Sequence, residues 1–122
     1  MNIIYTSMRP LRDLRISSRD QNICLREYCS NNQLIFSIPI PEFVYPGCYI
    51  QLFNIIKASY AMDSSLIFYS VLQLIEYQGD RDQLIFKIFS VFKCIHFARE
   101  NESFNKDQFG LLIECLNSYD LD

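Results

Sequence analysis

Four arginines near the N-terminus have a spacing that predicts a binding surface. They lie three, three and four positions apart and are Arg9, Arg12, Arg15 and Arg19. If residues 10–19 form a helix that starts at Pro10, this spacing places all four guanidinium groups on one face. Such a stripe can bind the phosphates of a nucleic acid or the carboxylates of a protein. If the segment is a strand instead, the arginines are scattered and form an ordinary solvated surface.

A second set of potential ligands is made of sulfur and imidazole. The chain has one histidine and five cysteines: His96, Cys24, Cys29, Cys48, Cys94 and Cys115. A Cys₃His zinc site of Cys24, Cys29, Cys94 and His96 is one hypothesis. Structural zinc sites, however, usually contain two close cysteine pairs, and buried free cysteine behaves as a small hydrophobe. We therefore predict free thiols in the core, no metal and no cofactor, in a reducing intracellular compartment, cytoplasm or nucleus.

The usual catalytic motifs are missing from the sequence. Its three glycines are isolated, which excludes phosphate-binding glycine loops, and neither G-x-S-x-G nor H-E-x-x-H occurs. Cys94 and His96 are two positions apart, which on a helix points them in different directions. We therefore expect that the protein is not an enzyme.

Aromatic residues around a proline-containing loop, 39–49, form a candidate partner site. Phe43, Tyr45 and Tyr49 lie close together in this loop. Exposed aromatic side chains on loops are good anchors for a protein partner, although the same residues can simply pack the loop onto the core.

The apolar pattern predicts strands first and helices afterwards. Residues 2–5 suit a short strand, and 22–40 alternate around an Asn-rich turn, which predicts a β-hairpin. Tyr45-Pro46-Gly47-Cys48 suits a tight turn with positive φ at the glycine. Helical spacing then predicts helices at about 48–62, 65–77 and 82–99, and a last one after a capping box at Asn105 and Gln108. The alternative for 66–98 is one long hairpin.

These elements predict an α+β fold. A small antiparallel sheet from the N-terminal hairpin region is followed by about four helices packed on one face. Residues 1–122 fit a single domain, strand-rich over 1–41 and helix-rich over 46–119. The segments of the sequence are all too short or too charged for a membrane span.

Composition and charge point to binding. Half of the residues are hydrophobic and the net charge is −3. A small domain with so many apolar residues leaves some apolar surface exposed, and this favours a protein partner and a homo-oligomer. Residues 1–29 carry five arginines against three acids, while 100–122 carry six acids against one lysine. We interpret the chain as an interaction module, with a viral accessory protein as the compositional hypothesis; the alternative is a nucleic-acid-binding accessory protein that uses Arg9 to Arg19.

Overall fold

Five strands and five helices are interspersed along the chain in the computed structural model, which describes residues 2–12, 15–58 and 63–120. The strands are β1 (Ile3–Ser7), β2 (Ile40–Glu42), β3 (Ser65–Phe68), β4 (Cys94–Phe97) and β5 (Glu102–Asn105). The helices are α1 (Ser18–Asn31), α2 (Ile50–Ala58), α3 (Leu72–Ile75), α4 (Arg81–Val91) and α5 (Phe109–Asp120), with a short 3-10 turn, η1 (Lys106–Gln108), before α5. The predicted α+β class is confirmed, whereas the predicted order of strands first and helices afterwards is wrong.

The strands form one mixed sheet in the order β2-β1-β3-β4-β5. All the pairs from β2 to β4 are parallel, and only β5 pairs antiparallel, with β4. The prediction of an antiparallel sheet is corrected accordingly. Strands of a covered parallel sheet are buried on both faces and therefore have apolar runs in place of alternation. β3 is an example, because all four of its residues are buried.

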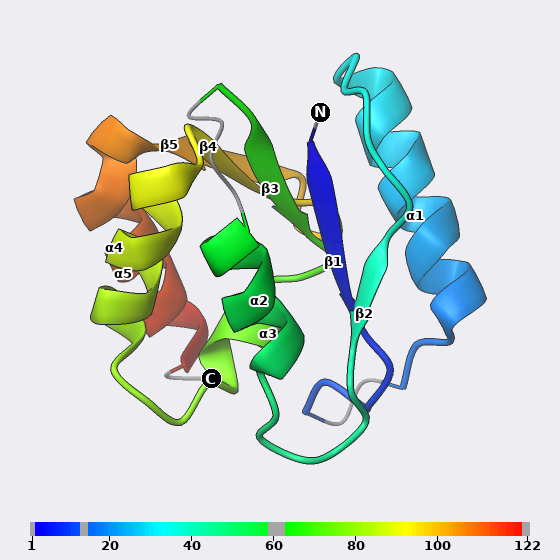
Figure 1. Ribbon diagram of the computed structural model, residues 1–122, viewed down its shortest axis with the longest axis horizontal. Coiled ribbons are helices and arrows are strands. Elements are labelled where there is room, and N and C mark those ends of the chain that lie inside the picture. The colour runs from blue at the N-terminus through cyan, green and yellow to red at the C-terminus, as the bar shows by residue number, and fades with distance from the viewer. Residues whose placement is uncertain (1, 13–14, 59–62, 121–122) are drawn as a thin grey trace.

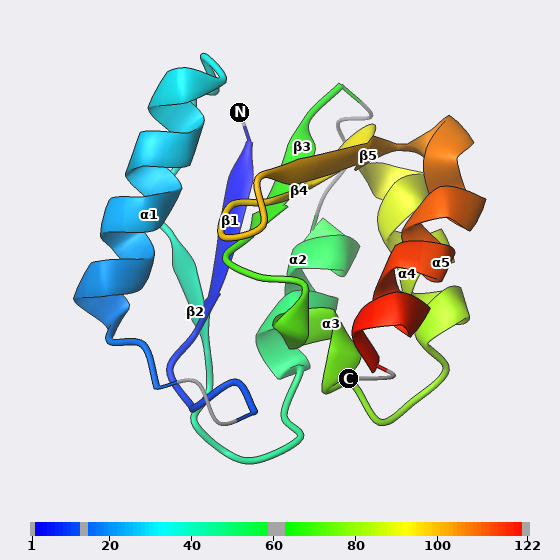
Figure 2. The same cartoon turned by 180° about the vertical axis from the view of Figure 1, so that it is seen from behind.

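Helices cover both faces of the sheet (Figures 1 and 2). The larger core lies on the face covered by α2, α3, α4 and α5, where it includes Tyr5, Phe68 and Phe97. This is the predicted set of four helices on one face. The smaller core lies on the other face, where Ile4 and Ile67 of the sheet pack against α1. A helix on this second face was not predicted.

The predicted hairpin over 22–40 is wrong, because most of its first half is α1. Buried residues of α1 follow the helical template i, i+4, i+7 and i+8: Gln21, Leu25, Tyr28 and Cys29. Ser17 caps the helix, since its side chain accepts a hydrogen bond from the Asp20 N–H at 3.1 Å. The chain then returns beside β1, where Asn2 pairs with Phe36 and Tyr5 with Ile40. The pairing therefore shifts by one residue, which indicates a bulge between the two contacts.

The other predicted helices have mixed outcomes. The helix at 48–62 is confirmed as α2, and its last residues, 59–62, lie outside the described part. The capping box before α5 is confirmed, as is the turn at 45–48, with a Gly47 φ of 71°. The predicted helices 65–77 and 82–99 each contain a strand, β3 and β4. These strands pair in parallel, so the alternative hairpin over 66–98 is also wrong.

No helix in the described part of the chain is both long and apolar enough to cross a membrane.

The connections leave the sheet in two directions. The link from β1 to β2 runs through α1 on one face, and the link from β2 to β3 runs through α2 on the other. In open parallel sheets, ligands bind outside the carboxyl ends of the strands at such a switch point. The carboxyl ends of β1 and β3 are therefore where a ligand site is expected.

Candidate functional site

The predicted arginine stripe is not formed. The stripe required a helix over 10–19, but α1 begins at Ser18, and residues 13–14 lie outside the described part. Arg9 turns toward the protein, where its Nη1 donates to the carbonyl oxygens of Phe43, Tyr45 and Cys48 at 3.4, 3.2 and 3.0 Å. Its guanidinium also lies 5.0 Å from the centre of the Tyr49 ring. Arg9 therefore holds the loop after β2 in place.

The other three arginines lie on the surface in different settings. Arg12 has a φ of 56°, and its backbone N–H donates to the Glu76 carboxylate. Its Nη1 also donates to the Tyr119 carbonyl oxygen at 3.4 Å. Arg15 and Arg19 are exposed, Arg15 before α1 and Arg19 in its first turn. These groups do not form one phosphate-binding row.

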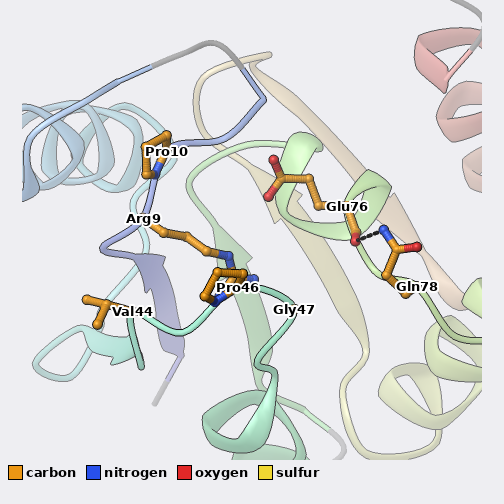
Figure 3. A pocket seen from close by; sticks show the side chains of 7 residues that line it. All are labelled: Arg9, Pro10, Val44, Pro46, Gly47, Glu76 and Gln78. Carbon is orange, nitrogen blue, oxygen red and sulfur yellow. Dashed lines mark hydrogen bonds between the residues drawn. The ribbon is translucent and has the colours of Figure 1, made fainter.

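A cleft of about 610 Å³ lies at the carboxyl end of the sheet. Figure 3 shows its lining, which comes from the loops after β1 and β2 and from the end of α3: Arg9, Pro10, Val44, Pro46, Gly47, Glu76 and Gln78. Its two charged side chains already hold backbone groups of the surrounding loops, as described above. The cleft is therefore a feature of loop packing in which the charges are largely occupied.

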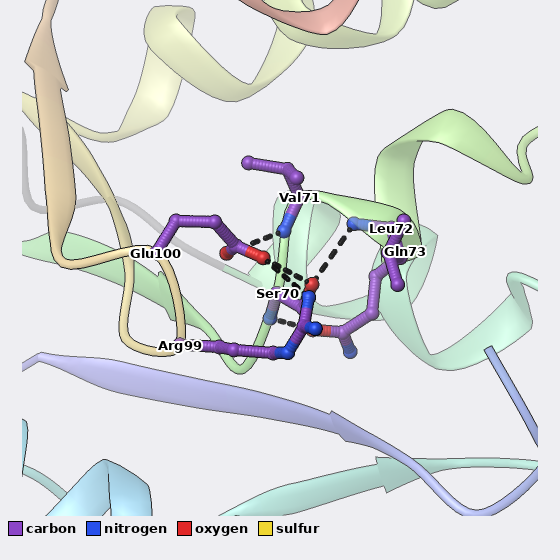
Figure 4. A network of polar contacts seen from close by, with 6 residues as sticks. All are labelled: Ser70, Val71, Leu72, Gln73, Arg99 and Glu100. Carbon is purple, nitrogen blue, oxygen red and sulfur yellow. Dashed lines mark hydrogen bonds and ion pairs between the residues drawn. The ribbon is translucent and has the colours of Figure 1, made fainter. Parts of the chain in front are cut away.

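A serine and a carboxylate meet beside this end of the sheet (Figure 4). The Ser70 hydroxyl donates to Glu100 Oε2 at 2.7 Å, and Glu100 Oε1 accepts the Val71 N–H at 3.0 Å. Ser70 Oγ also accepts the Leu72 N–H at 3.2 Å. A serine beside a carboxylate is a possible nucleophile and base. Ser70 is 0% exposed, however, so this network connects the turn after β3 to the loop after β4 and does not face a substrate.

Two more buried polar side chains hold the strand ends together. Glu42 Oε1 accepts the Tyr5 O–H at 2.9 Å and the Leu52 N–H at 3.3 Å, and its Oε2 accepts the N–H groups of Phe43 at 2.9 Å and Gln51 at 3.1 Å. Burial is the main cause that raises the pKa of Tyr5, and the Glu42 carboxylate is the second. The phenol therefore stays protonated and donates to Glu42.

Gln73 links β1 to the turn after β3 in a similar way. Its Nε2 donates to the Tyr5 carbonyl oxygen at 3.3 Å and to Ser7 Oγ at 3.0 Å, and its Oε1 accepts the Ser70 N–H at 3.0 Å. These buried side chains occupy the space in which a ligand of an open parallel sheet usually binds.

Cys94 and His96 lie on a strand, which corrects the prediction that they point in different directions. Alternate residues of a strand share a face, so both lie on the α1 side of β4. Tyr28 of α1 contacts His96, with 2.6 Å between its hydroxyl and Nδ1. Burial is the main cause that raises the pKa of Tyr28 to about 12, followed by the Cys94 and Cys29 thiols, so the phenol stays protonated beside the imidazole. Among the described residues, no three histidine, cysteine or acidic side chains gather to hold a metal, so the hypothetical zinc site is not formed.

This imidazole makes stability depend on pH. Burial, and then Lys93, lower the pKa of His96 below its usual 6.5, so protonation favours the unfolded chain. Its contribution is complete above pH ~6.5 and declines as the pH falls below that value. Between pH 7.5 and 5.5 we expect the wild type to lose about 1 kcal/mol more stability than His96→Gln. Urea unfolding at both pH values measures this, and equal losses would contradict it.

Several large exposed apolar side chains come from the segments that flank β2, the edge strand of the sheet. We call them the edge surface: Ile35, Ile38, Phe43, Val44, Tyr45 and Ile50. Ile38 is 86% exposed, Tyr45 70% and Phe43 44%. Two of the three predicted aromatic anchors are therefore on the surface. The third, Tyr49, is 4% exposed and donates its hydroxyl to the Gln73 carbonyl oxygen at 2.6 Å.

The sequence prediction missed Ile35 and Ile38 because it assigned them to a hairpin. A signal was present, since Pro39 and Pro41 lack the N–H that a central strand needs. An apolar residue that precedes an edge strand does not have to be buried in the core.

Comparison with known proteins gives no relative for this chain. No family model, no curated protein and no solved structure matches it.

Proposed function

We propose that this protein acts as a non-enzymatic interaction module that binds a protein partner through the edge surface. The exposure of large apolar side chains along one sheet edge carries the proposal. Apolar groups scattered over a surface need no explanation, but a group of them at an edge and its adjoining loop is typical of an interaction site. Tyr45 and Phe43 are the anchors, since aromatic side chains often dominate binding energy.

The loop that carries these anchors is held in place before any partner arrives. Arg9 binds the carbonyl oxygens of Phe43 and Tyr45, and Glu42 binds the Phe43 N–H. A fixed loop loses little conformational entropy on binding, which favours affinity. Arg9 thus supports the proposed site as a positioning residue, although the sequence predicted it as an anion-binding residue.

The edge strand limits how a partner can bind. Pro39 and Pro41 remove two backbone donors from the outer side of β2. A partner strand therefore has few groups with which to extend the sheet. We expect contacts between side chains, with an apolar pocket on the partner that accepts Tyr45.

Photo-crosslinking tests this proposal. A photoreactive phenylalanine analogue at Tyr45 should crosslink one protein in cells of the source organism, whereas the same analogue at Lys87, an exposed residue of α4, should not. With the purified partner, changing both Phe43 and Tyr45 to serine should weaken binding by at least about tenfold. Phe86→Ser removes a similarly exposed apolar group from α4 and should leave the affinity unchanged. Equal affinity of the double variant and the wild type would refute the proposed site.

Nucleic-acid binding through Arg9, Arg12, Arg15 and Arg19 has less support. Arg9 is engaged by three carbonyl oxygens, and the remaining arginines do not share a helix face. Binding that falls steeply with salt and is lost in Arg15→Glu with Arg19→Glu would favour this alternative.

A further inference from the structure

The outer face of α1 carries a row of side chains in which charged and apolar residues alternate. Its members are separated by 4, 3 and 4 positions and are all exposed: Arg19, Ile23, Arg26 and Ser30. Residues with this spacing share one side of a helix. Ile23, between the two arginines, is 53% exposed. We call this row the basic stripe.

The outer face of α5 and the turn before it carries a row of opposite charge. It has the same separations of 4, 3 and 4 positions and is also exposed: Asp107, Leu111, Glu114 and Ser118. Leu111 is 54% exposed and has the place that Ile23 has in the other row. Among the described residues, none of the four charged side chains of the two rows is in an ion pair. We call this row the acidic stripe.

The two stripes match position by position. When α1 and α5 pack side by side in parallel, equal helical spacing brings Ile23 opposite Leu111 and Arg26 opposite Glu114. Asp107, in the 3-10 turn before α5, then lies at the Arg19 end of the contact. We propose that the basic stripe of one copy of this protein binds the acidic stripe of a second copy. The apolar pair lies at the centre of this contact, and the charge pairs lie on either side of it.

The neighbours of the stripes favour the parallel orientation. Asp20 follows Arg19, and Lys106 precedes Asp107. When two helices pack in parallel, residues one position after the stripe of one helix lie on the same side of the contact as residues one position before the stripe of the other. The flanking positions of a parallel coiled coil meet in the same way. Asp20 therefore lies near Lys106, which adds a third pair of opposite charges. In the antiparallel orientation Arg19 faces Glu114, so Asp20 lies near Cys115 and gains no opposite charge.

The stripes cannot meet within one molecule. α1 covers one face of the sheet beside β1, while α5 packs against the other face and contacts β5 at the far edge (Figures 1 and 2). The contact therefore uses two different surfaces of successive copies. Such head-to-tail contacts repeat and give chains or closed rings. This self-association does not involve the edge surface, so it goes beyond the proposed function and is tested separately from it.

The expected association is weak and sensitive to salt, because exposed ion pairs contribute little and are screened. Sedimentation equilibrium of the full chain at about 50 mM and 500 mM salt should show an association constant lower at high salt by about tenfold. A salt-independent constant, or a monomer at every concentration, would overturn the proposal.

Charge exchange gives the decisive experiment. One variant carries Arg19→Glu with Arg26→Glu, and the other carries Asp107→Lys with Glu114→Lys. Each should lose self-association by at least about tenfold, because each has two stripes of the same sign. An equimolar mixture should associate again, because every contact then joins opposite charges. Circular dichroism confirms that both variants are folded.

Two controls separate this contact from general charge effects and from the edge surface. Lys57→Glu with Lys87→Glu changes the net charge by the same amount as the α1 variant but lies on α2 and α4, and it should associate like the wild type. Tyr45→Ser should also associate like the wild type while it loses the partner. Failure of the mixture to associate, or loss of association in the Lys57 and Lys87 control, would overturn the proposal.

Discussion

Replacing Glu42 with alanine is expected to lower the free energy of unfolding by about 4 kcal/mol. The carboxylate is 1% exposed and accepts hydrogen bonds from the Tyr5 hydroxyl and three backbone N–H groups. Two of these N–H groups, of Gln51 and Leu52, belong to the first turn of α2, where the helix dipole favours a negative charge. Alanine leaves these donors without an acceptor, and the buried ones lose most because water does not reach them.

Urea unfolding at pH 7 measures this loss, and two other variants calibrate it. Tyr5→Phe removes one of the donors to Glu42 and should cost about 1 kcal/mol. Glu27→Ala removes an exposed carboxylate from α1 and should change stability by less than about 0.5 kcal/mol. A loss of less than 1 kcal/mol for Glu42→Ala would mean that the carboxylate is not what holds β2 to α2.

Replacing Gln73 with leucine is expected to cost about 3 kcal/mol, although leucine is similar in size. Gln73 is 1% exposed, and its amide binds the Tyr5 carbonyl oxygen, the Ser7 hydroxyl and the Ser70 N–H. Leucine provides no hydrogen bond to these buried groups. The loss should therefore fall on the carboxyl ends of β1 and β3.

Hydrogen exchange of the folded protein locates this effect. In Gln73→Leu, the amide of Ser70 should exchange faster than in the wild type by more than the global loss of stability accounts for. Gln83→Leu, at an exposed position of α4, serves as the matched control and should leave both quantities nearly unchanged. Unchanged protection of Ser70 would show that Gln73 fills space without bonding the strand ends.

The parts of the fold that the sequence predicts well are those with local signals. The capping box at Asn105 and Gln108 and the turn at Gly47 each depend on residues within four positions. β3 and β4 depend on distant partners. Their apolar runs are short, and a buried parallel strand cannot be distinguished from a buried helix by periodicity alone.

The same contrast between local signals and distant contacts explains why only part of the candidate site was predicted. Tyr45 is adjacent to Pro46 and Phe43 is two positions after Pro41, and such proline-containing loops are found on the surface. Tyr49 follows them in sequence, but it is the first buried residue at the start of α2. The role of Arg9 required knowledge that the loop after β1 lies beside the loop after β2, a contact between residues 34 to 39 positions apart.

The position of β1 has a consequence for how this chain acquires its structure. β1 precedes all the other elements in sequence, yet it is an inner strand, paired on one side with residues 40–42 and on the other with residues 66–68. During synthesis its second neighbour does not exist until residues 66–68 have been made. Pairing across such separations slows folding, because a long loop must close before any contact forms. Until β3 has been made, β1 therefore has one unpaired edge that is open to mispairing in a nascent chain.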